Sequence, residues 1–391
     1  MLSVSSESAE STAEENSDSA ISWIRLSAIE LPLAHTVSDA KVLTGRQLPL
    51  TSVSMLCAEV QTRDGHEGFG YGYTLRTGGS ALFAMASDLA PLLIGEDAND
   101  IARLWDKLSW AAISVGRSGV SPQATGALDT ALWDWKSKRA GLSLAKFLGC
   151  HRDSLRCYNT SGGYLQAPME ELLDNMAKAK DAGIGGLKMK VGQPDASLDI
   201  KRVEAARTRL GDDFPLMVDV NQQWDRPTAK RVGAALDAFN LTFLEEPLAS
   251  DDAEGHAMLA RTLKTPIATG EMLTSVAEHM RLIELRAVDY LQPDAPRIGG
   301  ITPFLKLMAI ADQFGLQITP HFVMEIHVHL MAAYPREPWV EHFEWFELLF
   351  NERLEIRNGR MMVPTRPGLG VSLNERAAGW TQQQAEFGKK A

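Results

Sequence analysis

The chain has 391 residues, of which 45% are hydrophobic and 23% are charged. This composition is typical of a globular protein and excludes a disordered, collagen-like or coiled-coil chain. Its 39 basic and 50 acidic residues give a net charge of −11, which argues against a nucleic acid bound through its phosphates, and the absence of any long apolar run predicts no membrane span.

Residues 1–20 are expected to form a flexible acidic tail. They contain seven serines and five acidic residues but no lysine or arginine, so they bury too little apolar surface to offset the entropy of ordering. The segment also lacks the basic start and the apolar run of an export signal. The three cysteines of the chain are not spaced as a zinc or disulfide framework, and we expect reduced thiols in a cytoplasmic protein.

Residues 21–150 are predicted to form an α+β domain, because strand patterns come first and helical patterns follow. Three partly alternating, β-branched or aromatic segments are predicted strands, at 21–32, 52–60 and 68–74. Three segments with apolar residues at helical spacing are predicted helices, at 81–92, 101–112 and 124–140. The glycines of the third strand, in GFGYGYT, do not match a dinucleotide-binding motif and are expected in turns or close backbone contacts.

From residue 151 to about 360, short apolar segments alternate with helical patterns. Eight of these segments are predicted strands, at 156–160, 186–191, 216–221, 241–247, 266–271, 288–294, 316–321 and 339–345. The intervening stretches carry apolar residues on one helical face, although the pattern is weaker in 322–338. Eight strands that alternate with helices predict parallel pairing and a closed (β/α) barrel.

Ionisable side chains stand at or near the C-terminal ends of nearly all these strands. In chain order they are Lys188, Lys190, Asp219, Glu245, Glu271, Asp294, His321 and Glu341. From Lys190 onward they are 20 to 29 residues apart, so we expect them to surround one cavity at the carboxyl end of the barrel. A single acid after a strand is more often a helix N-cap, but that interpretation does not explain the whole set.

Three of these residues form a candidate metal site. Asp219, Glu245 and Glu271 would bring oxygen ligands from three successive strands. Such a set suits Mg²⁺ better than zinc, because it contains no cysteine or histidine.

Two candidate acid/base groups would flank the metal. Lys188 and Lys190 are two residues apart on one strand and share a face, so each lowers the pKa of the other and makes a lysine base usable near neutral pH. Asp294 and His321 end adjacent strands, so the carboxylate could orient and charge the imidazole.

The ordered motifs of the chain resemble those of the enolase superfamily, mandelate racemase subgroup. They are ALDTALWDWKSKRAG (127–141), GLKMKVG (186–192), VDVNQQW (218–224), LEEP (244–247), ATGEM (268–272), QPDAPRIGG (292–300), TPHF (319–322) and PGLG (367–370). The resemblance covers nearly all of residues 22–388. Within the subgroup, VSDAKVLTGRQ (37–47), CYNTSGGYL (157–165) and HFEWFELLFNERLE (342–355) are most similar to dehydratases of galactarate and L-talarate.

The resemblance implies a modified (β/α)7β barrel at 151–360 under an N-terminal α+β cap at 21–150, which the C-terminal segment 361–391 completes. It also implies a homo-oligomer with one Mg²⁺ per subunit, held by Asp219, Glu245 and Glu271 with Asn221 in a supporting role.

The resemblance further implies the roles of the remaining site residues. Lys190 would be the base on one face of the substrate, and His321, paired with Asp294, would be the acid/base on the other. Lys188 and a protonated Glu341 would contact the substrate carboxylate at the metal.

The implied reaction is the dehydration of galactarate and L-talarate. Loss of the α-proton gives an ene-diolate, and loss of the β-hydroxyl then gives a keto-deoxy aldarate, 5-keto-4-deoxy-D-glucarate, with some epimerisation. An aldarate has a carboxylate at each end, so its site needs cations away from the metal. We predict that Lys41 and Arg76 in the cap loops bind the distal half of the substrate, and Arg46 is the next candidate.

Other functions remain as alternatives. Within the subgroup these are a dehydratase for another acid sugar and a racemase or epimerase. A muconate-type cycloisomerase or an acylsuccinate or dipeptide isomerase would carry a lysine where this chain has Asp294. A barrel without catalytic activity, used for binding, is disfavoured by the intact set of ionisable residues.

Overall fold

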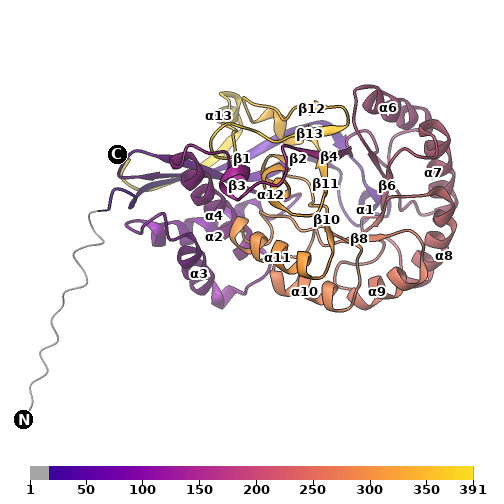
Figure 1. Cartoon of the computed structure of the whole chain (residues 1–391), viewed down its shortest axis with the longest axis horizontal. Helices are drawn as coiled ribbons and strands as arrows, with labels where there is room; N and C mark the ends of the chain where they lie inside the picture. The colour runs from indigo at the N-terminus through magenta and orange to yellow at the C-terminus, as the bar shows by residue number, and fades with distance from the viewer. Residues whose placement is uncertain (1–16, 391) are drawn as a thin grey trace, which may run out of the picture.

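An antiparallel sheet and a group of helices form the cap of the chain, which the computed structural model describes over residues 17–390 (Figure 1). The sheet has the order β14-β1-β2-β3, made of β1 (Ile21–Val37), β2 (Leu50–Thr62), β3 (Glu67–Leu75) and β14 (Thr381–Gly388). Because β14 is the last strand of the chain, the C-terminal segment completes the cap, as predicted. The predicted acidic tail lies outside the described residues up to position 16, and Ala20 already pairs with Asp97.

Helices connect the cap sheet with the rest of the molecule. They are α1 (Ala40–Leu43), α2 (Gly79–Leu89), α3 (Ile101–Ala111), α4 (Val120–Arg139) and α5 (Leu144–Phe147), with 3₁₀ turns η2 (Ala90–Leu93) and η3 (Ile113–Val115). The three predicted helices correspond to α2, α3 and α4. The single turn α1 was not predicted, because four residues are too few to show a helical period.

Alternating residues of β3 give this strand two different faces. On one face, a Cβ atom at Gly70 would lie 2.2 Å from the carbonyl oxygen of Ala127, so glycine allows α4 to pack directly on the strand. On the other face, Phe69, Tyr71 and Tyr73 are buried and contact the barrel. Close backbone contact, one of the two interpretations of the glycine-rich sequence, is therefore correct.

All eight predicted barrel strands are present. They are β4 (Ser154–Asn159), β5 (Leu187–Lys190), β6 (Leu216–Asp219), β7 (Leu244–Glu245), β8 (Ile267–Thr269), β9 (Tyr290–Leu291), β10 (Gln317–Ile318) and β11 (Trp339–His342). Parallel ladders run in chain order from β4 to β10, and β11 pairs with the other edge of β4. Within the described residues no ladder joins β10 to β11, but the Phe322 amide donates a hydrogen bond to Glu341 Oε2 across this gap at 2.7 Å.

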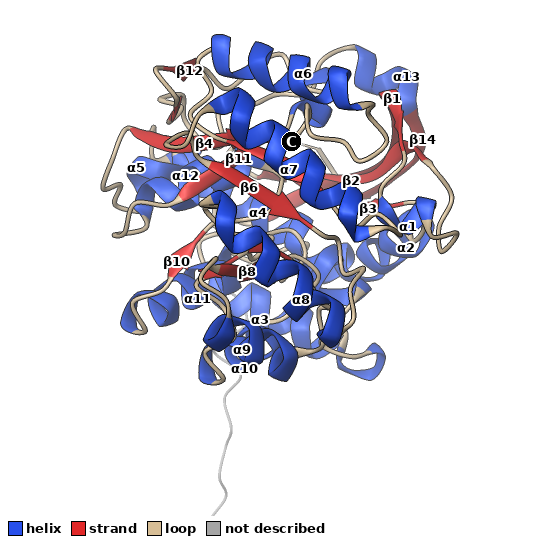
Figure 2. Cartoon of the chain, turned by 90° about the vertical axis from the view of Figure 1, so that its right-hand side faces the viewer, coloured by secondary structure: helices blue, strands red, loops and turns tan. Residues whose placement is uncertain are grey.

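Seven helices follow the first seven strands, which gives the (β/α)7β arrangement. They are α6 (Met169–Asp181), α7 (Ala196–Leu210), α8 (Arg226–Leu236) with η4 (Asp237–Phe239), α9 (Ala253–Thr262), α10 (Val276–Glu284), α11 (Ile301–Gln313) and α12 (Met324–Ala333). Helices α6 to α10 form the outer layer that faces the viewer in Figure 2. The weak pattern at 322–338 belongs to α12, which is buried along nearly its whole length and so has no polar face.

The chain returns to the cap after the last barrel strand. This segment contains η5 (Glu344–Leu348), β12 (Ile356–Arg357), β13 (Arg360–Met362) and α13 (Arg376–Trp380). Strand β13 pairs antiparallel with β4, so the returning segment first adds to the barrel sheet and then reaches β14.

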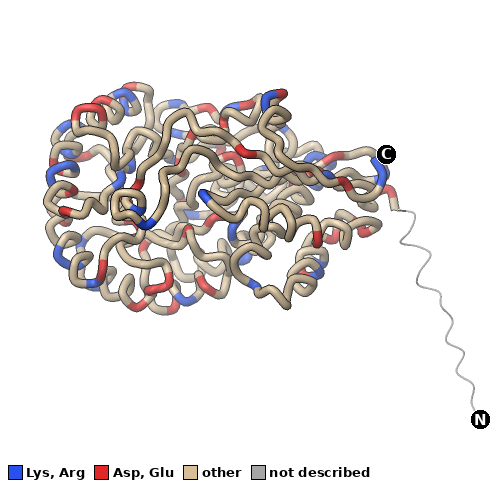
Figure 3. The backbone as a smooth tube through the Cα atoms, turned by 180° about the vertical axis from the view of Figure 1, so that it is seen from behind, with Lys and Arg blue, Asp and Glu red and all other residues tan. Residues whose placement is uncertain are grey.

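Acidic and basic residues are interspersed over the described backbone (Figure 3). The acidic residues among positions 17–390 are therefore not gathered in one part of this view. Among residues 17–390, no helix combines the length and the apolar character needed to cross a membrane.

Candidate active site

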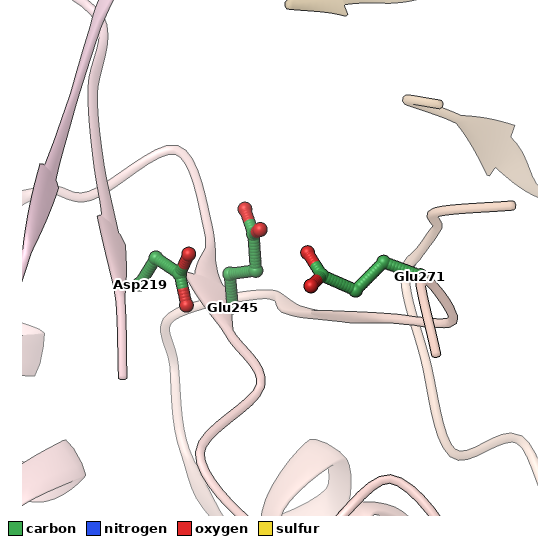
Figure 4. A group of neighbouring side chains, drawn as sticks. All are labelled: Asp219, Glu245 and Glu271. Carbon is green, nitrogen blue, oxygen red and sulfur yellow. The ribbon is translucent and has the colours of Figure 1, made fainter. Parts of the chain in front are cut away.

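Three carboxylates meet at the carboxyl ends of neighbouring barrel strands. Asp219 ends β6, Glu245 ends β7 and Glu271 follows β8 by two residues. One oxygen from each lies within 4.8 Å of the others, and all three side chains are buried. In Figure 4 the carboxylate of Glu271 points toward the other two residues. Buried negative charges are costly unless they are compensated, so this cluster fits a small divalent cation that prefers oxygen ligands.

Two lysines compensate the cluster in this structure. Lys188 Nζ lies 2.8 and 2.7 Å from the two carboxylate oxygens of Glu245, and Lys190 Nζ donates a hydrogen bond to Asp219 Oδ2. Burial lowers the pKa of Lys190 and Lys188 lowers it further, but the surrounding carboxylates, Asp219 above all, outweigh both effects and leave the pKa raised. The expected lowering of the lysine pKa is wrong for this arrangement, because Lys190 lies directly beside Asp219 in the β5–β6 ladder and the attraction of the carboxylates outweighs the repulsion from Lys188.

Glu341 on β11 forms a second ion pair with Lys188. Its Oε1 lies 3.0 Å from Lys188 Nζ and accepts a hydrogen bond from the Thr160 hydroxyl, while Oε2 accepts one from the Phe322 amide. Burial raises the pKa of Glu341, but the nearby cations, led by Lys188, outweigh burial and lower the pKa to about 2. Glu341 is therefore an ionised acceptor in this structure and not the protonated donor that the resemblance implied.

His321 and Asp294 form a hydrogen-bonded pair. Asp294 follows β9 and His321 follows β10, each three residues beyond the end of its strand. Nδ1 of His321 lies 2.9 Å from Asp294 Oδ2, and Nε2 lies 3.4 Å from Glu271 Oε2. Burial raises the pKa of Asp294, but His321 and Arg297 outweigh this effect and hold the pKa below its ordinary value. An ionised Asp294 thus orients the imidazole so that Nε2 faces the carboxylate cluster.

A cavity of about 260 Å³ lies between these barrel residues and the cap. Its lining includes Lys190, Asn221, Glu271 and His321 from the barrel and Lys41, Tyr73 and Arg76 from the cap. Asn221 also supports the cluster, because its Nδ2 donates a hydrogen bond to Asp219 Oδ2 at 3.1 Å. Lys188 is only 2% exposed and lies below the cavity, against Glu245 and Glu341.

Of the three predicted cap-loop cations, Lys41 and Arg76 reach the cavity. The guanidinium of Arg76 is already engaged, since Nη2 lies 3.0 Å from Asp39 Oδ2 and Nε donates a hydrogen bond to the Leu48 carbonyl at 2.9 Å. Arg76 therefore also ties together the two cap loops that border the cavity.

Arg46 is not brought to the cavity. Its Nη1 contacts Gln223 Oε1 at 3.3 Å, and it lines a separate surface hollow beside α7 and α8. The reason is local: Gly45, with a φ of 72°, turns the chain away after α1. The prediction that Arg46 serves as a reserve contact finds no support in this geometry.

Four further residues touch the site although the sequence did not identify them. They are Tyr73, Thr160, Gln292 and Arg297. Gln292 Nε2 donates to Glu245 Oε2 at 2.9 Å, and Arg297 Nη1 donates to the Glu271 carbonyl at 2.7 Å. Tyr73 donates its hydroxyl proton to Asp294 Oδ2 at 2.6 Å. The motif QPDAPRIGG contains Gln292 and Arg297 and could have indicated them, whereas nothing in the sequence places Tyr73 against the barrel.

Comparison with known protein families covers both parts of the molecule. A model described as the mandelate racemase / muconate lactonizing enzyme N-terminal domain matches residues 36–149. A second model, described as enolase C-terminal domain-like, matches residues 171–377. The chain belongs to the mandelate racemase subgroup of the enolase superfamily.

Individual members of the superfamily are closely similar to this chain. An L-talarate/galactarate dehydratase of Salmonella typhimurium is 58% identical over 379 residues, which are 97% of this chain and 95% of the relative. A crystal structure of the dehydratase from strain LT2, liganded with Mg and L-lyxarohydroxamate, has a TM-score of 0.94 and 55% identity and covers 100% of this chain and 99% of that one. The L-talarate dehydratase of Polaromonas sp. JS666, complexed with Mg and L-glucarate, has a TM-score of 0.92 and 62% identity and covers 95% of this chain and 99% of that one.

Proposed function

We propose that this chain is a Mg²⁺-dependent hydro-lyase that dehydrates galactarate and L-talarate to a keto-deoxy aldarate. The observation that carries the proposal is the arrangement of Lys190 and the His321–Asp294 pair around one buried carboxylate cluster, with Lys190 and His321 lining one cavity. The named substrates are supported by the similarity to L-talarate and galactarate dehydratases over nearly the whole chain.

Asp219, Glu245 and Glu271 would hold the Mg²⁺. Their fit rests on the three buried oxygens within 4.8 Å of one another, a donor set of the kind that Mg²⁺ prefers. The bound ion would supply positive charge that offsets the three carboxylates and the negative charge that develops on the substrate carboxylate.

Lys190 would accept the α-proton at Nζ. Its side chain is 17% exposed at the cavity, whereas Lys188 is buried beneath it. The raised pKa of Lys190 comes from the carboxylates, led by Asp219. When their charge is offset, burial and Lys188 remain and both lower this pKa, so a neutral amine becomes available as the base.

His321 would donate a proton from Nε2 to the departing β-hydroxyl. Asp294 at Nδ1 stabilises the charged imidazole before this step and holds its orientation. Elimination from the ene-diolate of the substrate gives an enol that becomes the keto-deoxy product, for which we propose 5-keto-4-deoxy-D-glucarate. Because Lys190 would act on one face of the ene-diolate and His321 on the other, return of a proton from His321 to the α-carbon gives the epimer.

Lys188 and the cap cations would bind the two ends of the substrate. Lys188 is placed to donate to the carboxylate near the cluster, with Glu341 fixing its position at 3.0 Å. Lys41 would attract the distal carboxylate of the substrate. Arg76 would contribute less, because Asp39 already offsets part of its charge. A homo-oligomeric state and a cytoplasmic location stay predictions.

The role of Lys190 can be tested by α-proton exchange in D₂O. In the Mg²⁺-loaded Lys190→Ala variant, we expect deuterium incorporation at the α-carbon of galactarate and L-talarate to vanish in at least one of the two substrates, as followed by NMR. Calorimetry should show that Mg²⁺ still binds. Unimpaired exchange in both substrates would contradict the assignment of Lys190 as a base.

The substrate assignment needs a separate experiment. Purified protein should form a keto acid from galactarate and L-talarate with Mg²⁺, and EDTA should abolish the reaction. If both were inert while another acid sugar reacted, or if epimerisation occurred without dehydration, the subgroup would stand and the proposed activity would be replaced.

A further inference from the structure

We propose that Tyr73, a residue of the cap, is a positioning residue for the acid/base pair of the barrel. Its hydroxyl group holds His321 and Asp294 in the arrangement that leaves His321 Nε2 facing the reacting atoms. The consequence for turnover rests on the proposed function, whereas the hydrogen bonds themselves do not.

Three polar atoms form a closed triangle behind the imidazole. Tyr73 Oη lies 2.6 Å from Asp294 Oδ2 and 3.1 Å from His321 Nδ1, and Asp294 Oδ2 lies 2.9 Å from the same Nδ1. The single hydroxyl proton of Tyr73 goes to the carboxylate, which can only accept. The phenolic oxygen and the carboxylate oxygen therefore both face Nδ1 as acceptors. Two acceptors at Nδ1 fix its proton there and keep Nε2 for chemistry.

The carboxylate of Asp294 is fully engaged by this arrangement. Its other oxygen, Oδ1, accepts a hydrogen bond from the Arg297 amide at 3.1 Å. Without the hydroxyl of Tyr73, Asp294 Oδ2 would keep only the imidazole as a partner. The carboxyl group could then rotate, and His321 would lose one of the two acceptors that fix its tautomer.

Packing holds the Tyr73 ring in one orientation. The residue is 1% exposed, and its ring makes edge contacts with Phe322 and Phe346 at centroid distances of 5.0 and 5.7 Å. The guanidinium of Arg297 lies 5.2 Å from the ring centroid. Burial raises the pKa of Tyr73 well above its ordinary value, against a lowering by Arg297, so the hydroxyl keeps the proton that it donates.

The alternation of β3 explains why a cap residue reaches the barrel. Glycines fill the face toward α4, and the aromatic side chains fill the opposite face, so every second residue of the strand points at the barrel. Tyr73 is near the end of β3, where this face meets the loops after β9 and β10. The hydrogen bonds of the acid/base pair are therefore completed by a residue of the cap, and they depend on the position of β3 relative to the barrel.

Tyr71 provides a matched control. It lies two residues earlier on the same face of β3, is completely buried and donates its hydroxyl proton to Glu325 Oε2 at 3.1 Å. A Tyr71→Phe change removes the same atom from the same sheet but leaves the contacts of Asp294 and His321 in place.

The first experiment compares two reactions of one substrate in the Mg²⁺-loaded full chain. The substrate is whichever of galactarate and L-talarate shows α-proton exchange that depends on Lys190. In Tyr73→Phe we expect dehydration to fall roughly 10- to 100-fold, the size expected from losing a hydrogen bond to a charged group. Exchange through Lys190 should change less than about twofold, because that base is untouched, so the ratio of exchange to dehydration rises.

A structural effect would give a different result. General loosening of the site lowers exchange and dehydration together and leaves their ratio unchanged. An unchanged ratio in Tyr73→Phe, or an equal rise of the ratio in Tyr71→Phe, would overturn the proposal.

The second experiment does not depend on turnover. In the ¹⁵N-labelled protein, which has nine histidines, the Nδ1–H signal of His321 is assigned by its loss in His321→Gln. We expect this signal to shift and to exchange faster with water in Tyr73→Phe but not in Tyr71→Phe. The same signal in all three proteins would overturn the inference. If the wild-type chain turned over neither aldarate, the proposed function would fail, and this spectrum would still decide whether Tyr73 orders the pair.

Discussion

Individual residues of the site are charged and yet buried, and each is tolerated because it has a partner. Lys188 is 2% exposed and Glu245 is completely buried, and they form an ion pair at 2.7 Å. Removing one member of such a pair leaves an uncompensated charge, which costs more than the pair contributes. The neutral residues that hydrogen-bond to these charges set their orientation, and they offer milder tests.

Gln292 is such a neutral residue. Its Nε2 donates a hydrogen bond to Glu245 Oε2, so Gln292→Leu should leave the carboxylate of Glu245 held by Lys188 alone while keeping a side chain of similar length. We expect the affinity for Mg²⁺, measured by calorimetry, to fall roughly 10- to 100-fold, as is common for residues that orient metal ligands. Gln317→Leu on β10 is the control, because that residue makes no contact with a carboxylate of the cluster. Equal affinities in the two variants would show that Gln292 does not orient Glu245.

At the scale of elements, the site depends on close packing of strands that are very short. Four barrel strands, β7 to β10, have only two or three residues, so the helices and loops around them fix the positions of the ionisable residues. The cap shows the same dependence, since α4 approaches β3 through glycine. A methyl group at such a position has no space, and close-packed interiors do not expand without cost.

Gly70 tests this contact. In Gly70→Ala the new Cβ would lie 2.2 Å from the Ala127 carbonyl oxygen and 2.4 Å from the Ala131 nitrogen, so β3 and α4 must separate. We expect a loss of unfolding free energy of roughly 3 kcal/mol or more in urea titrations, because these neighbours are backbone atoms that cannot move aside. Gly379→Ala, which meets no atom within 4 Å, should stay close to wild type. Comparable stabilities of the two variants would contradict the packing argument.

For the whole molecule, the interface between cap and barrel carries both packing and polar contacts. Tyr71 and Tyr73 on β3 reach Glu325 and Asp294 of the barrel, and α12 lies buried between the two parts. A carboxyl group inside this interface makes the stability of the assembled molecule depend on pH.

Glu325 is this group. Burial raises its pKa from 4.5 to about 7, against lowering by hydrogen bonds that include one from Tyr71. The stabilisation from its proton is therefore complete below about pH 4.5 and is lost as the pH rises through about 7. Glu325→Gln keeps an acceptor for Tyr71 but cannot ionise, so its unfolding free energy relative to wild type should rise with pH by at most about 1.4 kcal/mol per pH unit.

Urea unfolding between about pH 5 and pH 8 measures this difference. Groups common to both proteins, such as the buried His327 and His329, cancel in the comparison. The exposed Glu284→Gln variant serves as the control and should show no such trend. A constant difference between Glu325→Gln and wild type across this range would exclude the titration of Glu325.

By itself, the sequence determined the order of the elements and the three acidic residues that meet in the carboxylate cluster. Hydrophobic periodicity predicted eight barrel strands and three cap strands, and the regular placement of ionisable residues after strands predicted one site, because parallel strands bring their carboxyl ends to one edge. The resemblance added two expectations: that the barrel has no eighth helix, and that the C-terminal segment returns to the cap. The exact domain boundaries stay predictions.

Only the tertiary structure decided which charges face one another. In the folded chain, carboxylates lie against Lys190 and raise its pKa, and Lys188 lowers the pKa of Glu341. Arg46 points away from the cavity. Tyr73 contacts the His321–Asp294 pair. Periodicity reports which face of its own element a residue occupies, and it carries no information about the opposing element. Electrostatic energies depend on distances between atoms that are far apart along the chain, so they emerge only when the cap and the barrel are assembled.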